Sequence, residues 1–154
     1  MLYFHGNAED IGLSYEMLDH LRSTIKIHIL AIEYPGYGIY KSDACGADLI
    51  LEDAFTVFDY LVDTLQISSK DMILFGRSMG SGPSTHLAAK RNPAALLLMS
   101  PYTSIRHVVS NMVGKLMSVF VADRFVNIEA IKSVTCPTFI VHGQQDKLIP
   151  FSHA

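Results

Sequence analysis

A serine flanked by glycines is the feature of this chain that points most directly to chemistry. An apolar run at residues 72–75 precedes Gly76-Arg77-Ser78-Met79-Gly80, and a helical segment follows it to Arg91. A serine at such a strand-to-helix turn takes a strained backbone conformation that exposes its hydroxyl, and its neighbours two positions away must be nearly free of side chain. Gly-x-Ser-x-Gly arises by chance in roughly one chain in twenty of this length, so the flanking elements carry the prediction.

Other interpretations of this segment fit less well. A phosphate loop would need Gly-Lys followed by Ser or Thr, and a dinucleotide site would need Gly-x-Gly-x-x-Gly; neither occurs. A glycine-rich turn with a surface serine is the remaining alternative. We expect Ser78 to be a nucleophile, and we expect Gly82 to keep the new helix close to the strand.

Two backbone amides are candidates for stabilising the negative oxygen that attack by Ser78 would create. The amide of Met79 lies at the expected start of a helix, where the helix dipole favours anions. A second donor is expected from the turn after the first strand, where Asn7 is our choice and Ala8 the alternative. A simple tight turn is the other interpretation of His5-Gly6-Asn7.

A serine nucleophile also needs a base, usually a histidine held by a carboxylate. Asp146 follows a predicted strand, and the order serine then acid is that of α/β-hydrolases. A turn aspartate that caps the next helix is the alternative. His153 would have to reach both Asp146 and Ser78 to act as the base. We therefore expect the base beyond Ala154, because a crossover helix and a strand need at least ~15–20 residues.

The remaining histidines show no spacing typical of a metal site. His5 and His142 end predicted strands and are expected to hydrogen-bond to backbone in the adjoining loops. No His-Glu-x-x-His motif occurs. We predict neither a metal nor another cofactor.

The candidate residues are positioned by alternating strands and helices. Apolar runs predict the strands, and apolar residues at steps of three and four predict the helices, the first of them capped by Asp10. The predicted strands are residues 2–5, 25–32, 71–75, 94–99 and 136–142, and the predicted helices are residues 11–23, 48–66 and 84–91. This alternation is typical of a parallel sheet with helices on both faces and ligands at the carboxyl ends of its strands.

Two helices carry apolar stripes that predict their buried faces. The stripe of the first helix is Leu13, Met17, Leu18 and Leu21, and that of the second is Leu51, Phe55, Phe58, Val62 and Leu65. The segment 102–134 is less regular, with one or two helices expected over 105–121. We expect it to cap a site or to cover the sheet.

Composition limits the class of protein. The 154 residues suffice for a single domain, and 49% apolar with 18% charged residues suits a sheet covered on both faces. A net charge of −3 without a basic cluster argues against a nucleic-acid partner. No apolar run approaches the ~20 residues of a membrane span. Cys45 and Cys136 form no motif, which suits a reducing compartment.

Together these motifs resemble the α/β-hydrolase superfamily, and within it the serine-hydrolase branch that contains the α/β-hydrolase-domain depalmitoylases. The matching segments are residues 5–12, 33–38, 76–80, 100–101, 141–146 and 151–153, in family order. The resemblance implies a three-layer α/β-hydrolase fold with a central, mostly parallel sheet. It implies Ser78 as nucleophile, Asp146 as acid, and Asn7 and Met79 as oxyanion amides, with a catalytic histidine other than His153.

The same resemblance implies that the chain is truncated at both ends, lacking the first hairpin and the C-terminal histidine loop. The cysteine-rich tail that anchors some depalmitoylases is absent from this sequence, so membrane association is not carried over. A strand at 138–141 would then be a sheet edge without its neighbour. We expect the 154-residue chain to self-associate or to be unstable, with little turnover.

The expected function is a serine hydrolase that cleaves an ester or thioester through an acyl-enzyme on Ser78, including the palmitoyl thioester of a lipidated protein. A serine peptidase of the same fold and a non-catalytic binding protein are the alternatives. A histidine some tens of residues after Asp146 in a longer sequence would favour the enzyme. The expected location is cytoplasmic, with peripheral membrane association of the full-length protein left open.

Overall fold

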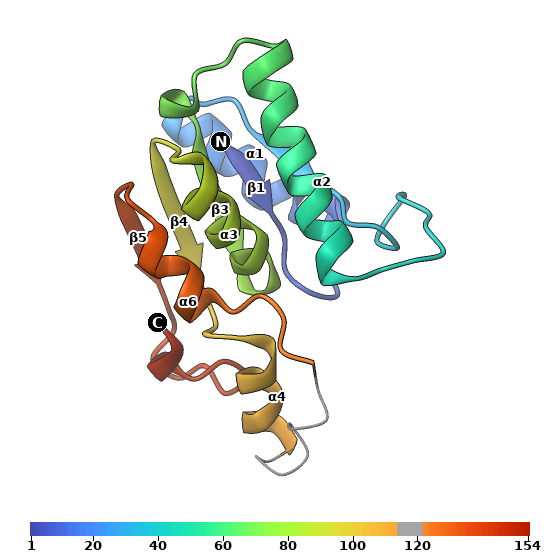
Figure 1. Ribbon diagram of the computed structural model, residues 1–154, viewed down its shortest axis with the longest axis vertical. Helices are drawn as coiled ribbons and strands as arrows, with labels where there is room; N and C mark the ends of the chain where they lie inside the picture. Colours follow the sequence, from blue (N-terminus) through green and yellow to red (C-terminus); the bar gives the residue numbers. More distant parts are fainter. Residues whose placement is uncertain (114–121) are drawn as a thin grey trace.

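A parallel five-stranded sheet forms the centre of the molecule, as predicted (Figure 1). The computed structural model describes residues 1–113 and 122–154. The strand order is β2-β1-β3-β4-β5, and every neighbouring pair is parallel. The strands are β1 (Leu2–Phe4), β2 (Leu30–Ile32), β3 (Ile73–Arg77), β4 (Ala95–Met99) and β5 (Thr138–Val141).

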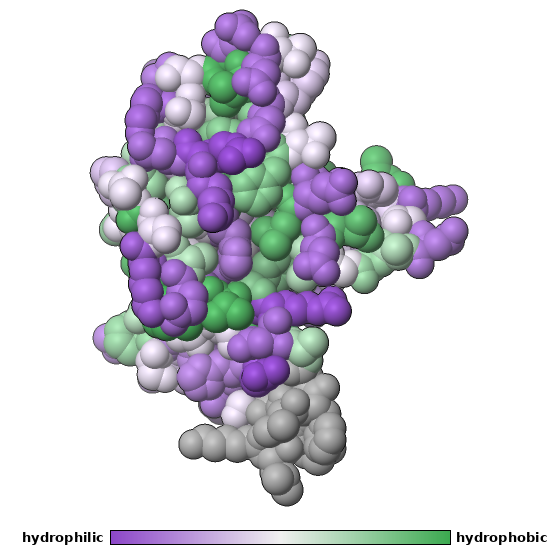
Figure 2. All heavy atoms as spheres, viewed as in Figure 1, coloured by the Kyte–Doolittle hydropathy of each residue, from purple (hydrophilic) through white to green (hydrophobic). Residues whose placement is uncertain are grey.

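Helices cover both faces of this sheet. In Figure 1, α2 and α3 lie in front of the strands and α1 lies behind them. The helices are α1 (Ile11–Ile25), α2 (Ala47–Asp59), α3 (Ser81–Arg91), α4 (Ile105–Val113) and α6 (Asn127–Ala130). On the side of α2 and α3, hydrophilic residues cover most of the surface, and apolar residues show between them (Figure 2).

The alternation of side chains along β1 creates two separate cores. Leu2 and Phe4 point to the side of α2 and α3, where they join Phe58 and Leu87 in the larger cluster. Tyr3 points to the other side and packs with Leu18 of α1 in a smaller cluster. The sheet is therefore apolar on both faces, which explains the near-continuous apolar strands of the sequence.

The second strand is shorter than predicted. Residues 25–32 were expected to form it, whereas α1 extends to Ile25 and β2 begins at Leu30. Lys26 ends the helix in a left-handed conformation, with its N–H bonded to the carbonyl of Arg22 at 2.9 Å. Because the neighbouring β1 has only three residues, it pairs with three residues of β2.

The predicted helix over residues 48–66 is also interrupted. The α-helix ends at Asp59, and a π-helical turn, Tyr60–Thr64, follows. Phe58 of the predicted stripe is buried, but Leu65 is 50% exposed. The wider π turn changes the angular position of the residues after it, so Leu65 leaves the buried face.

The first helix begins as predicted, because Asp10 accepts a hydrogen bond of 2.7 Å from the amide of Leu13. Three residues of the predicted stripe face the sheet, since Leu18 is buried in the smaller core and Met17 and Leu21 pack against it. Leu13 is the exception: it is 72% exposed, whereas the neighbouring Ser14 is buried.

The described part of residues 102–134 lies beside the carboxyl end of β4 and over α3 (Figure 1). Ile105 and Ile131 from this segment pack against the larger core. Of the predicted helical region 105–121, residues 105–113 form α4, and residues 114–121 lie outside the described residues. Whether the segment caps a site stays a prediction.

Three further features bear on the expectations from composition. Cys45 is exposed and Cys136 buried, and both are free thiols. Within residues 1–113 and 122–154, no helix combines the length and apolarity needed to cross a membrane. In the same ranges, no three histidine, cysteine or acidic side chains gather as a metal site would need.

Candidate active site

Ser78 occupies a strained turn directly after β3. Its φ angle is +49°, in the left-handed region that residues other than glycine rarely adopt. Ser78–Gly80 form a single 3₁₀ turn that leads into α3, and the side chain of Ser78 is only half buried. This is the backbone conformation that the Gly-x-Ser-x-Gly motif predicted.

The two glycines of the motif are required by close backbone approaches. A Cβ atom on Gly80 would overlap the carbonyl oxygen of Phe4 and lie 2.8 Å from that of His5. A Cβ atom on Gly76 would overlap the carbonyl oxygen of Gly80 and the hydroxyl of Ser84. The serine turn is thus packed directly against the end of β1, where the opening turn begins.

Gly82 lies close to side chains of the segment that follows β4. A Cβ atom there would meet the ring of Phe125 and, at 2.7 Å, the hydroxyl of Tyr102. The absence of a side chain at Gly82 therefore leaves room beside α3 for the segment that follows β4, and its role in keeping α3 close to β3 stays a prediction.

The turn that carries Asn7 and the turn that carries Met79 meet at one tyrosine. The hydroxyl of Tyr37 lies 2.7 Å from Oδ1 of Asn7 and 3.9 Å from the sulfur of Met79. Tyr37 belongs to the motif at residues 33–38, to which sequence reasoning assigned no role. The structure therefore brings both predicted oxyanion residues to one place, while the function of their amides stays a prediction.

A second tyrosine holds the serine turn from the side of β4. Tyr102 donates a hydrogen bond of 3.1 Å to the carbonyl oxygen of Met79. Its side chain is buried, and burial raises the pKa of the phenol well above its usual value, so it remains a donor at neutral pH. Only the position of Tyr102 after a predicted strand could have indicated this contact in advance.

His5 and Glu33 anchor the opening turn. Nδ1 of His5 lies 2.8 Å from the carbonyl oxygen of Gly6, which agrees with the predicted backbone contact. Nε2 lies 2.8 Å from Oε1 of Glu33, an interaction that the sequence did not reveal. Glu33 also accepts the amides of Ile11 and Tyr34, each at 3.2 Å. One carboxylate therefore connects the ends of β1 and β2 with the start of α1.

Asp146 lies in the turn after β5, with its two oxygens in different settings. Oδ1 accepts hydrogen bonds of 2.9 Å from the amides of Leu148 and Ile149, the arrangement of a turn aspartate. Oδ2 lies 3.8 Å from Nε2 of His142. The turn therefore holds the carboxylate through Oδ1, and these two hydrogen bonds do not involve Oδ2.

His142 makes the backbone contact that was predicted for it. Its Nε2 lies 2.7 Å from the carbonyl oxygen of Ile149. This contact stabilises the turn that carries Asp146.

The ring of His153 is held away from the predicted catalytic residues. Its Nδ1 lies 3.2 Å from both the amide and the hydroxyl of Thr103, and its Nε2 lies 2.8 Å from the Asn111 side chain. Burial lowers its pKa, with further lowering by His107 and His142. Among the described residues, no hydrogen bond joins His153 to Ser78 or to Asp146.

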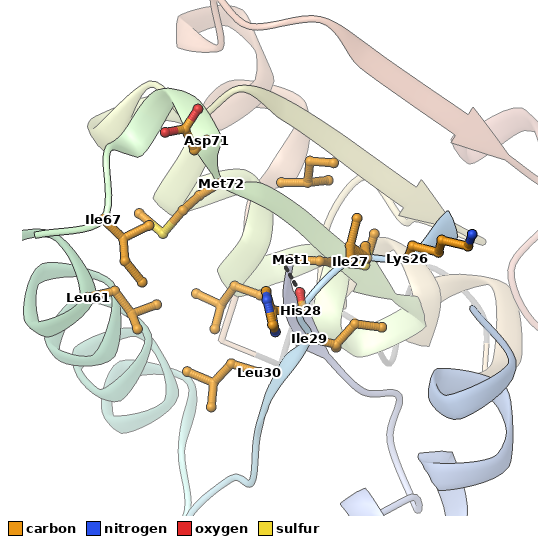
Figure 3. Close-up of a pocket in the computed structure, with 12 residues that line it drawn as sticks. Met1, Lys26, Ile27, His28, Ile29, Leu30, Leu61, Ile67, Asp71 and Met72 are labelled. Atoms are coloured by element: carbon orange, nitrogen blue, oxygen red, sulfur yellow. Dashed lines mark hydrogen bonds between the residues drawn. The ribbon is translucent and has the colours of Figure 1, made fainter. Parts of the chain in front are cut away.

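One cavity lies far from these residues. It measures about 630 Å³ and lies at the amino ends of β1, β2 and β3, lined by apolar side chains that include Met1, Leu30 and Ile67 (Figure 3). Ligands of parallel sheets bind at the opposite, carboxyl end. This cavity is therefore separate from the candidate site around Ser78.

Comparisons with known proteins agree with this architecture. Residues 1–133 match the family model described as serine aminopeptidase, S33. The chain is 34% identical over 153 residues to human alpha/beta hydrolase domain-containing protein 17B, covering 99% of this chain and 52% of that protein. It is 32% identical to alpha/beta hydrolase domain-containing protein aho-3 of Caenorhabditis elegans, covering 99% and 45%. The chain spans about half the length of the curated relatives it matches.

Solved structures support the same fold. An alpha-beta hydrolase from Vibrio vulnificus superimposes with a TM-score of 0.83 at 21% identity, covering 96% of this chain and 57% of that one. An esterase from Pyrococcus furiosus gives a TM-score of 0.76 at 17% identity, covering 99% and 64%.

Proposed function

The chain belongs to the serine aminopeptidase S33 family of α/β-hydrolases, and from this premise we propose that it is a serine hydrolase acting through an acyl-enzyme on Ser78. The observation that carries the proposal is the φ angle of +49° at Ser78, in a turn packed against the end of β1. Such strain at a half-buried hydroxyl persists where the surroundings impose it, and it is frequent at catalytic positions.

In the proposed reaction, Oγ of Ser78 attacks the carbonyl carbon of an ester or thioester while a histidine takes its proton. The resulting oxyanion accepts hydrogen bonds from the amides of Asn7 and Met79. Its collapse breaks the bond to the leaving group, which departs as an alkoxide or thiolate and takes the proton from the histidine to give the alcohol or thiol. Water then hydrolyses the acyl-enzyme by the reverse roles. Asp146 orients the histidine, which we place outside the described residues.

We propose a thioester, including the palmitoyl thioester of a lipidated protein, as the substrate class. The support is the similarity to the alpha/beta hydrolase domain-containing protein 17B. An amide substrate is the second candidate, because the matching family model is described as a serine aminopeptidase. The two differ in the leaving group, since a thiolate leaves without prior protonation and an amine does not.

The test uses the full-length protein that contains this chain and a fluorophosphonate probe. We expect Ser78 to be labelled, Ser78→Ala to abolish labelling, and Ser23→Ala, a change at an exposed serine of α1, to leave it intact. Turnover of a palmitoyl thioester peptide and of an aminoacyl p-nitroanilide then distinguishes the two substrate classes. Labelling that persists in Ser78→Ala, or that is missing from the wild type, would refute the proposal.

A further inference from the structure

An ion pair joins the residue before Ser78 to the opening turn. Arg77 is the last residue of β3, and its guanidinium contacts Oε1 of Glu9, which lies two positions after Asn7. The other carboxylate oxygen of Glu9 accepts a hydrogen bond of 3.0 Å from the amide of Gly6. The Glu9 side chain therefore connects both ends of the short Gly6–Glu9 segment to the serine turn.

The backbone alone does not make this connection. The ladder between β1 and β3 ends at the pair Phe4 and Gly76. The residues that matter for the proposed chemistry, Asn7 and Met79, both lie beyond that pair. Their separation must consequently be set by packing at Gly80 and by side-chain contacts across the gap, and the Glu9–Arg77 ion pair is a charged contact of this kind.

We infer that the Glu9–Arg77 pair is a positioning device that sets the distance between the two oxyanion amides. The inference rests on the proposed function, because it concerns the same site. Neither side chain touches the reacting atoms in this account; the pair acts through the turn that carries Asn7. A displacement of about 1 Å at such a site costs on the order of 100-fold in rate, so a modest contact has a large kinetic effect.

Because the pair is partly exposed to solvent, an experiment can distinguish a positioning role from a purely structural one. The side chain of Arg77 is 41% exposed and that of Glu9 20% exposed. Ion pairs that are open to solvent contribute little to folding stability, because water and salt screen them. Breaking this pair should therefore lower kcat far more than it lowers the melting temperature.

The chain offers a matched control on the far side of the fold. Arg91 of α3 pairs with Asp59 at 2.7 and 2.8 Å, and their side chains are 38% and 39% exposed. The substitution Arg91→Met breaks an arginine–carboxylate pair of similar exposure without touching the turns. Arg77→Met removes the guanidinium of the proposed pair and keeps an apolar stem in its place.

The experiment compares Glu9→Gln, Arg77→Met, the double variant, Arg77→Lys and Arg91→Met in the full-length protein, with a p-nitrophenyl ester as substrate. We expect each single variant of the pair to lower kcat by ~10- to 100-fold with KM changed by less than about 3-fold. The double variant should fall no further than the worse single variant, because both remove one contact. Arg77→Lys should recover part of the loss, and Arg91→Met should match the wild type.

Four outcomes would overturn the inference. Losses in Glu9→Gln and Arg77→Met that multiply in the double variant would show that the residues act independently. A fall in melting temperature in proportion to the fall in kcat would show a structural role only. Unchanged kcat in both single variants, with turnover still dependent on Ser78, would refute the positioning role and leave the proposed function standing. A wild type without Ser78-dependent turnover would refute both.

Discussion

The hydroxyl of Tyr37 donates a hydrogen bond of 2.7 Å to the side-chain oxygen of Asn7. This bond joins the loop after β2 to the turn after β1. Burial, and to a lesser degree the nearby Cys45, raises the pKa of the Tyr37 phenol, so the hydroxyl stays protonated at neutral pH. The position of Asn7 therefore depends on a neighbouring loop as well as on its own turn.

Tyr37→Phe should lower the rate without unfolding the protein. The phenyl ring keeps the packing against the core, while the bond of the hydroxyl to Asn7 and its weaker contact with the sulfur of Met79 are lost. One such bond contributes about 1 kcal/mol, which corresponds to a decrease in kcat of roughly 5-fold. Steady-state kinetics of the full-length protein on a p-nitrophenyl ester would measure it, with Tyr40→Phe in the same loop as control. Equal losses in both variants would contradict the assignment.

Gly80→Ala should destabilise the fold and abolish the site. The added Cβ would overlap the carbonyl oxygen of Phe4, and backbone at the end of a core strand cannot move aside. We expect the free energy of unfolding to fall by at least ~2 kcal/mol. The control is Gly143→Ala, since no atom lies within 4 Å of a Cβ at Gly143. Denaturant titration of both variants gives the comparison; similar midpoints would disprove the steric argument.

Asp146→Asn should separate the two functions of this side chain. The amide oxygen of asparagine can still accept the hydrogen bonds from Leu148 and Ile149, so the turn should keep its conformation. The lost charge should lower kcat by about 10⁴-fold if Asp146 orients the catalytic histidine. Circular dichroism and turnover of the full-length protein test both halves. Near-normal turnover would leave Asp146 with the structural role only.

The stability of the fold should fall in mildly acidic solution, in part because of His86. Burial lowers the pKa of His86 below its usual value of 6.5, with a smaller contribution from Lys90. The unfolded chain takes up a proton near pH 6.5 while the folded chain resists it. The unfolding free energy should therefore be unaffected above that pH and should fall as the pH drops below it.

His86→Leu should flatten this dependence. Urea titrations of the wild type and the variant between pH 8 and pH 5 would show it, and His20→Gln, at an exposed histidine of α1, serves as control. The variant should lose less stability than the wild type on acidification. A slope that is steeper than that of the wild type would contradict the assigned direction of the pKa shift.

The edge strand β5 should cause the 154-residue chain by itself to self-associate. All four of its residues are exposed, including Phe139 at 62% and Val141 at 45%, and the strand is hydrogen-bonded on one side, to β4. An apolar edge of this kind pairs readily with another chain. Light scattering should detect oligomers, and Phe139→Lys should reduce them. A monodisperse wild-type monomer would disprove the prediction.

Local patterns in the sequence were sufficient to predict the alternation of strands and helices and the serine turn. Gly-x-Ser-x-Gly between an apolar run and a helical run predicts a strained turn from five residues alone, and Ser78 has the expected positive φ angle. Asp10 caps α1 for the same reason, since a cap and its amide are three residues apart. Interactions of this range join residues that are close in the sequence, so a local pattern is enough to predict them.

Tertiary structure alone decided which side chains support the site. Arg77 and Glu9 are 68 positions apart, and Tyr37 and Asn7 are 30 apart, so no periodicity relates them. Their contacts exist because parallel strands place all their carboxyl ends at one edge of the sheet, where turns from distant segments meet. The shortened β2 and the exposure of Leu65 have a similar origin, because pairing length and helix phase depend on neighbours that the local sequence does not specify.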